Sequence, residues 1–315
     1  MAHHITEAET AQYLPHGRRP DESALDRVYE RFASSDPFQP VTGFVDHVTM
    51  GAEALVALGL GAKVEGWASR SRARPYRPPV AGIPMSSDWP QALGRKQCHG
   101  DWIAHFEAEL EHNPFADVLA RWVPRFSHDM GALLFHGVIR TGHATRALEH
   151  GDTPARRREL ARGLALWAIG IRNGVPDPAY RPASANAAPD AAIAYARIGA
   201  ACFVRRPGIV LLHHVTGPMA YLIVSKYLDA DARRLGSDGF SRTHASLNPD
   251  HEHDDAVPPP APLDRARIAA LAEQPDSREL HAGLDNVHAI KLTEAACRAF
   301  DATGDAIFLR AADKA

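Results

Sequence analysis

The helical spacing of apolar residues is the feature that most constrains the fold of this chain. In segment after segment, apolar side chains recur three or four residues apart, as they do on the buried face of an α-helix. The sequence contains no convincing run of alternating β-branched residues, the pattern that marks a half-buried strand. We therefore predict an all-α fold.

The periodic segments predict helices over residues 22–33, 42–58, 63–70, 101–112, 115–124, 131–149, 153–174, 187–204, 209–229, 263–273, 283–302 and 305–312. Long loops rich in proline, glycine and asparagine are predicted over residues 71–90, 174–190 and 236–262. Loops of this length in a compact domain usually form lids or binding walls, or are disordered. No internal repeat is evident in the sequence.

Length and charge exclude several classes of function. The 315 residues are enough to bury a large core, and the formal net charge of −3 provides no basic field for nucleic acid. The apolar tract at residues 209–224 is interrupted by two histidines and a Gly-Pro pair, so we do not expect it to span a membrane. The sequence specifies no oligomeric state.

The cysteines and the N-terminus indicate a cytoplasmic protein. An odd number of widely spaced cysteines is typical of free thiols in a reducing compartment; they are Cys98, Cys202 and Cys297. The first residues lack the basic and apolar regions of a signal peptide.

Histidine is unusually frequent, with 18 residues, and several histidines fall on helix faces that point inward. His47 lies on a stripe of small and apolar residues, and His136 begins a stripe that continues to His143. A single inward histidine is more often a core residue hydrogen-bonded to a carbonyl than a ligand. Several helices with such a histidine favour a shared metal ion, since an unpaired buried imidazole costs about 1–3 kcal/mol.

The segment from Gly283 to Phe300 adds a lysine to this pattern, because His288 and Lys291 share one inward stripe. In a dry pocket a lysine amine becomes neutral. It can then act as a Schiff-base nucleophile or take up carbon dioxide and offer a carbamate oxygen to a metal. The alternative is an ordinary lysine whose charged end reaches water.

Six motifs, in order, resemble those of the questin-oxidase-like proteins. They read "DHVTMGAEALVALG", "LGRKQCHGDWIAHFEAEL", "LLFHGVIRTGHATRAL", "RRRELARGLALWA", "LLHHVTGP" and "NVHAIKLTEAA". This family includes fungal enzymes that open an anthraquinone ring oxidatively and many bacterial proteins of about this length. The motifs extend from about residue 43 to residue 300, so residues 1–315 are predicted to form one domain.

The resemblance implies an all-helical oxygenase with a non-haem Fe(II) held by four histidines and a carboxylated lysine. The positions that match these ligands are His47, His136, His214, His288 and Lys291. In this bacterial-type sequence Arg140 stands where fungal enzymes tend to carry another histidine. His213 is one residue, about 100° around the helix, from the motif position, so we expect it to point away from the metal.

The activity implied by the resemblance is a monooxygenase or dioxygenase reaction of dioxygen with a small aromatic polyketide or quinone. Ring cleavage or oxygen insertion would follow. Residues that would orient the ligands or move protons are Glu53, Arg140 and His143. Aromatic residues near the first long loop that could line a pocket, although such residues are more often core, are Tyr76, Trp89 and Trp102.

Some of the fungal reactions are associated with NADPH, so the resemblance leaves an NADPH requirement open. The glycine-rich stretch at residues 59–64 lacks a third glycine and follows a helix, and it indicates a helix end instead. Two alternatives to an oxygenase remain: a non-catalytic helical protein that binds metal for storage or structure, and a hydrolase or Schiff-base enzyme that uses Lys291.

Overall fold

The computed structural model describes residues 22–39, 43–71, 73–172, 191–245, 247, 265–273 and 286–315. Within these residues the chain forms α-helices and short 3-10 helices but no β-strand. Extended pairing among them is confined to two isolated bridges, Ser35 with Pro75 and Phe38 with Val45. The all-α prediction is confirmed. That residues 1–315 form a single domain stays a prediction.

The first half of the chain contains α2 (Glu22–Arg31), α3 (Val48–Ala57), η1 (Gly61–Lys63), α4 (Val64–Ala68), α5 (Trp89–Ala92), η2 (Lys96–Cys98), α6 (His99–His112), α7 (Phe115–Phe126), η3 (Ser127–Asp129) and α8 (His136–His150). The second half contains α9 (Pro154–Gly170), α10 (Ala191–Arg205), α11 (Ile209–Val224), η4 (Ser225–Tyr227), α12 (Ala230–His244), α13 (Arg265–Leu271), α14 (Asn286–Thr303) and α15 (Ile307–Lys314).

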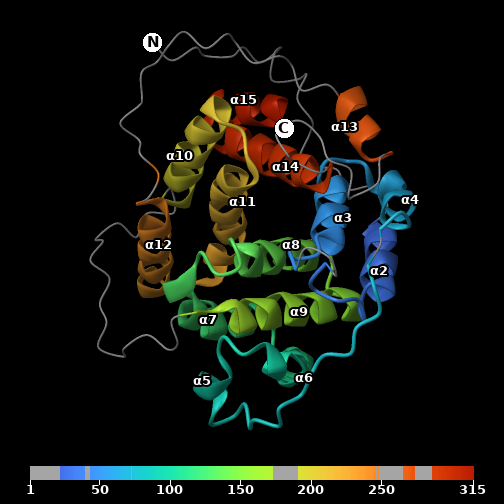
Figure 1. Ribbon diagram of the computed structural model, residues 1–315, viewed down its shortest axis with the longest axis vertical. Coiled ribbons are helices and arrows are strands. Elements are labelled where there is room, and N and C mark those ends of the chain that lie inside the picture. Colours follow the sequence, from blue (N-terminus) through green and yellow to red (C-terminus); the bar gives the residue numbers. More distant parts are fainter. Residues whose placement is uncertain are drawn as a thin grey trace.

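Helices α8 and α9 lie side by side across the middle of the molecule (Figure 1). Below them α6 packs against α9, and above them α11 and α3 pack against α8. Helix α14 contacts both α11 and α3, so four helices, α3, α8, α11 and α14, surround one interior region. This arrangement brings together helices that are up to about 240 residues apart in the sequence.

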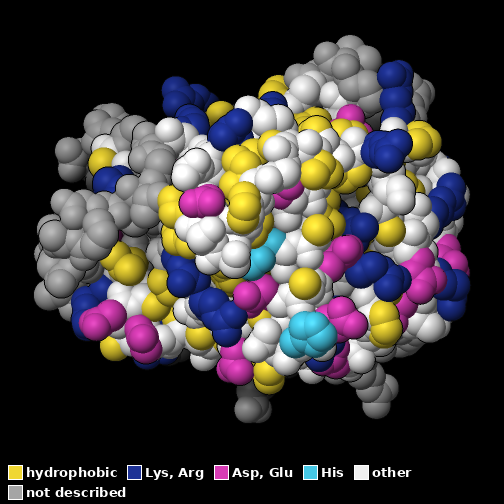
Figure 2. Space-filling view, turned by 90° about the horizontal axis from the view of Figure 1, so that it is seen from below, with side chains coloured by type: hydrophobic (Ala, Val, Ile, Leu, Met, Phe, Trp, Pro, Cys, Tyr) yellow, Lys and Arg dark blue, Asp and Glu magenta, His cyan; other side chains and the backbone are white. Residues whose placement is uncertain are grey.

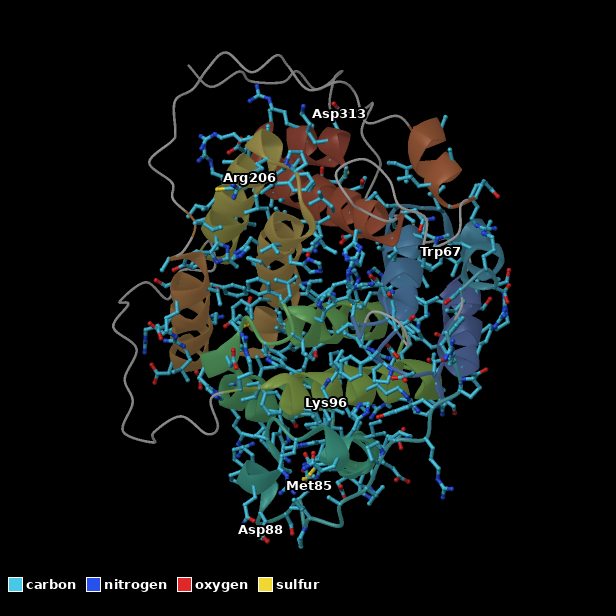
Figure 3. All side chains as sticks on the ribbon, viewed as in Figure 1. Trp67, Met85, Asp88, Lys96, Arg206 and Asp313 are labelled. Atoms are coloured by element: carbon cyan, nitrogen blue, oxygen red, sulfur yellow. The ribbon has the colours of Figure 1, made fainter. Side chains whose placement is uncertain are left out.

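Apolar side chains fill the space between the helices (Figure 3). Trp67, Trp102 and Trp167 are each fully buried. Trp102 stacks on Phe106 and lies edge-on to Trp122, with ring centroids 5.5 Å apart in each pair. Trp102 therefore belongs to the core, which is the commoner role for a tryptophan on an apolar helix face.

Two predicted helices begin later than the sequence pattern suggests. The helix predicted from residue 42 starts at Val48, and the helix predicted from residue 131 starts at His136. Before His136 the backbone forms a left-handed turn in which Leu133, Leu134 and Phe135 have φ of 49°, 53° and 64°. The apolar residues of this turn continue the helical spacing, and so the pattern conceals it.

Helix α12 occupies residues that the sequence predicted in part as a loop, and that prediction is wrong. Two glycines discouraged a helix, since glycine costs about 1 kcal/mol in a helix interior. At Gly236, however, any Cβ would lie 2.0 Å from the Tyr221 hydroxyl of α11. Close packing against α11 explains why glycine is used there, and tertiary contact outweighs propensity. Residues 246 and 248–262 of this predicted loop, and the predicted loop at residues 174–190, lie outside the described residues.

One helical stretch, Ile209–Tyr227, is long and apolar enough to cross a membrane, but 78% of its most apolar window is buried inside the protein. It is the central helix of a core, which is consistent with a soluble protein. On the face seen in Figure 2, basic and acidic side chains are interspersed. This mixture agrees with the small net charge of −3.

Candidate metal centre

One histidine from each of the four surrounding helical segments reaches the same interior region. His47 immediately precedes α3, His136 is the first residue of α8, and the other two belong to α11 and α14. The four are His47, His136, His213 and His288, and we call them the histidine cluster. One ring nitrogen of each lies within 4.8 Å of the others, and none of the four residues is more than 5% exposed. The cluster could hold a metal ion.

The spacing of the rings suits a common ligand. The Nε2 atoms of His47 and His136 are 2.6 Å apart, and those of His136 and His213 are 3.2 Å apart. The ring centroid of His288 is 4.4 Å from that of His47. Metal–nitrogen bonds of about 2.1 Å would separate adjacent donor atoms by roughly 3 Å. The observed separations lie close to this value on either side.

Hydrogen bonds fix the tautomers of two of these histidines. Nδ1 of His136 is 2.5 Å from the Leu133 carbonyl oxygen, and Nδ1 of His213 is 2.6 Å from the Ile209 carbonyl oxygen. Because a carbonyl oxygen only accepts, both Nδ1 atoms carry hydrogen. The two Nε2 atoms of the neutral rings are then bare, and their lone pairs face each other across 3.2 Å. A cation at this point would convert repulsion into attraction.

Burial keeps three of the four cluster histidines uncharged. It lowers the pKa of His47, His136 and His213 well below the usual value, and the positive charge of Lys291 lowers the pKa of each further. The neighbouring histidines act in the same direction; for His213 their effect exceeds that of Lys291. Imidazole binds a metal in its neutral form, so these three histidines are in the protonation state that coordination requires.

Lys291 lies one turn after His288 on α14 and is 1% exposed. Its charge affects three histidines of the cluster, which places the amine beside them. The alternative of a lysine whose charged end reaches water is therefore wrong. Its carbamylation stays a prediction.

The left-handed turn before α8 sets the position of His136. The backbone N–H of His136 donates to the Leu133 carbonyl at 3.2 Å, and the His136 ring donates to the same oxygen. A left-handed conformation costs a non-glycine residue about 1–2 kcal/mol, and here it is adopted three times in succession. Such strain is typical of functional sites, where the surrounding structure holds the backbone in place.

The prediction that His214 would join the other three histidines is wrong, and His213, predicted to point away, takes its place. His214 instead faces α12, where its Nδ1 lies 3.3 Å from Nε2 of His244. Burial lowers the pKa of His214 to about 4. Helix α11 is apolar around most of its circumference and buried, so its hydrophobic pattern does not specify its rotation.

A stripe of small residues could have revealed the correct rotation of α11. Gly217 and Ala220 follow His213 by four and seven residues, and both face the α8 side. A Cβ at Gly142 of α8 would lie 2.7 Å from the Ala220 carbonyl, and a Cβ at Gly217 would meet the Phe135 ring. Small residues thus mark the face along which α11 approaches α8, and His213 lies on that face.

The three residues predicted to assist the metal lie in two separate pairs. Glu53 and His143 are joined by a hydrogen bond of 2.7 Å between Oε2 and Nδ1. Arg140 instead donates to both carboxylate oxygens of Glu159 on α9, at 2.7 and 2.9 Å. This pairing accounts for the burial of Arg140, and a catalytic role for any of the three stays a prediction.

Several charged residues that complete these pairs were not predicted from the sequence: Arg146, Glu159, Glu294 and Arg298. All lie inside helices, and Glu294 and Arg298 follow Lys291 by three and seven residues on α14. A second and third charge along the face that already carried an inward lysine was the available signal.

Comparison with protein-family models and with curated proteins finds no match to this chain.

Proposed function

We propose that this protein is a non-haem iron oxygenase in which the histidine cluster holds Fe(II). The observation that carries the metal is the pair of bare Nε2 atoms of His136 and His213, which face each other at 3.2 Å. Four neutral imidazoles and an oxygen donor suit Fe(II). The choice of iron and of oxygenase chemistry comes from the resemblance to the questin-oxidase-like proteins. In the ligand set proposed for this chain, His213 takes the place of His214.

Fe(II), when bound, would supply the activation of dioxygen for attack on an electron-rich aromatic or quinone-type substrate. The carbonyl groups of Leu133 and Ile209 hold the imidazoles of His136 and His213 in the orientation that presents Nε2. Burial of all four histidines excludes water from the ligands. Lys291, as a carbamate, would add the negative charge that neutral imidazoles lack.

His143 and Glu53 form a carboxylate–imidazole pair that can hold a proton. Because the Glu53 carboxylate accepts, Nδ1 of His143 carries the hydrogen and Nε2 is bare. This pair lies about two helical turns from His136, so it is better suited to proton transfer at a distance than to direct orientation of a ligand. The Arg140 guanidinium forms a buried ion pair with Glu159 and is not part of the pair of His143 and Glu53.

Metal analysis of the purified protein tests the proposal. We expect about one iron per chain after anaerobic loading, and oxygen uptake with polyphenolic quinones that is lost in His136→Gln. Oxygen uptake measured with and without NADPH decides whether the reaction requires that reductant. Zinc in the cluster without oxygen uptake would favour the non-catalytic metal-binding protein, and borohydride trapping of a carbonyl compound on Lys291 would favour a Schiff-base enzyme. We further propose a cytoplasmic location, since the three cysteines are free.

A further inference from the structure

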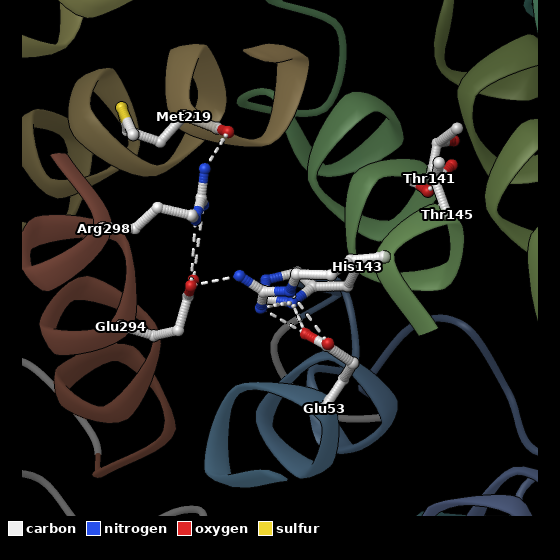
Figure 4. Close-up of polar contacts among 8 residues, drawn as sticks. Glu53, Thr141, His143, Thr145, Met219, Glu294 and Arg298 are labelled. Atoms are coloured by element: carbon white, nitrogen blue, oxygen red, sulfur yellow. Dashed lines mark hydrogen bonds and ion pairs between the residues drawn. The ribbon is translucent and has the colours of Figure 1, made fainter. Parts of the chain in front are cut away.

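A second buried polar layer lies beyond the histidine cluster (Figure 4). Glu53 of α3 accepts hydrogen bonds from His143 Nδ1 at 2.7 Å and from Arg146 Nε at 2.9 Å, both on α8. Arg146 also donates to Glu294 of α14, and Glu294 Oε1 accepts from Arg298 Nε at 3.0 Å. We call these five residues the ion-pair network.

The ion-pair network also reaches the fourth helix. Nη1 of Arg298 donates to the backbone carbonyl of Met219 on α11 at 2.7 Å, so Arg298 links Glu294 to α11 (Figure 4). Each of the four helices that supply the histidine cluster is thereby connected to another of them through this layer.

The network is balanced in charge and largely buried. Two carboxylates face two guanidinium groups, and burial lowers the pKa of His143, which is therefore neutral. Glu53 and Glu294 are 0% and 1% exposed, and Arg146 is 7% exposed. Loss of one partner would leave a buried charge unpaired, which is strongly destabilising.

The network repeats the pattern of the cluster two turns further along each helix. The pairs, each formed by a cluster histidine and a network contact six or seven residues later, are His47 and Glu53, His136 and His143, His213 and Met219, and His288 and Glu294. This separation corresponds to about 9–10 Å along a helix axis. One layer therefore constrains the other through four short, rigid stretches of helix.

Hydrophobic contact alone would position these helices poorly. The hydrophobic effect has no directional preference, and α11 is apolar on nearly all sides, so beyond the small residues that let it approach α8 closely, apolar burial adds little to fix its rotation or offset. Charge-assisted hydrogen bonds have defined directions. A metal site needs its ligands held within about 0.5 Å and 10–20°.

We propose that the ion-pair network is a positioning device for the metal centre, which fixes the rotation and offset of α3, α8, α11 and α14 and thereby the geometry of the histidine cluster. The proposal rests on the proposed metal site. It goes beyond that site because residues that do not touch the metal determine how well it is held.

The test compares Glu294→Gln with Glu159→Gln. Glu159 is a matched control, because it is 4% exposed and both its oxygens bind one arginine, but it joins α8 to α9, which carries no cluster histidine. Both changes remove one buried carboxylate with little change in volume. Co(II) serves as the probe, with affinity from titration and ligand geometry from the visible spectrum. We expect Glu294→Gln to bind Co(II) about 10–100 times more weakly with an altered spectrum, and Glu159→Gln to match the wild type.

Equal Co(II) affinities and identical spectra for the two variants would overturn the proposal. If Glu294→Gln does not fold, Arg298→Met replaces it, since Arg298 is partly exposed and its loss breaks the link to α11 while Arg146 keeps both carboxylates. An unchanged spectrum in that variant would also overturn the proposal.

A readout without metal separates this proposal from the proposed function. The ring-nitrogen NMR signals of the cluster histidines in the metal-free protein should shift in Glu294→Gln and not in Glu159→Gln. If the wild type failed to bind Co(II), the metal function would be refuted, while these signals would still decide whether the network positions the cluster. Unshifted signals in Glu294→Gln would refute the positioning role.

Discussion

Replacing either of two adjacent histidines of α11 should have very different effects on metal binding. His213 has its bare Nε2 3.2 Å from that of His136, whereas His214 turns toward His244 on α12. Replacing His213 by glutamine removes one of four nitrogen donors. The same change at His214 leaves all four donors in place, and so the pair forms its own control.

The size of the expected difference in affinity follows from the number of donors, since each of the four cluster histidines offers one ligand atom. A four-ligand structural site in a zinc-finger peptide binds zinc with an apparent free energy of about 10–16 kcal/mol, or roughly 2.5–4 kcal/mol for each ligand. Each 1.4 kcal/mol is a tenfold change, so we expect His213→Gln to weaken binding by about 10²–10³. His214→Gln should change affinity less than about threefold and lower stability by about 1 kcal/mol, through loss of one hydrogen bond.

Competition with a chromophoric chelator for Zn(II) or Co(II) at pH 7.5 measures both variants, and circular dichroism confirms that each is folded. Equal weakening by the two variants, or weakening by His214→Gln alone, would refute the rotation of α11 and the cation site derived from it. The second result would restore the ligand set implied by the family resemblance.

Further measurements test other parts of the structure. Unfolding by urea should show the metal-free protein losing stability as pH falls from 7 to 5.5. Burial holds the pKa of His99 and His214 near 4 and the pKa values of His47, His136 and His213 well below normal. The unfolded chain therefore binds protons that the folded chain does not, at about 1 kcal/mol per group over this interval. Stability that is constant or rises would contradict these shifts. At Leu134, with φ of 53°, the glycine variant should be more stable than the alanine variant by about 1 kcal/mol in thermal unfolding, the reverse of their order in a helix. Cys98 and Cys297 are buried with raised pKa values, so a thiol reagent should modify no more than one cysteine of the native protein, and rapid reaction of a second would show that these sites open.

The sequence showed which helices carry inward polar residues wherever one face of a helix is clearly apolar and the other polar. The stripe of α14 identified His288 and Lys291, and both are buried. The same argument failed on α11, because a helix that is apolar all round has no face that the pattern can distinguish. The sequence therefore indicated a histidine on α11 but not which of two neighbours points to the cluster.

The all-α fold, the inward faces of α8 and α14 and the abundance of histidine followed from the sequence by itself, because helical periodicity is a local property of consecutive residues. Tertiary structure decided which histidine of α11 faces His136, where α8 begins, and that Gly236 lies within a helix. It also paired Arg146 with Glu53 and with Glu294, which lie 93 and 148 positions away from that arginine. Contacts over such separations depend on how whole helices pack, and no local pattern records that packing.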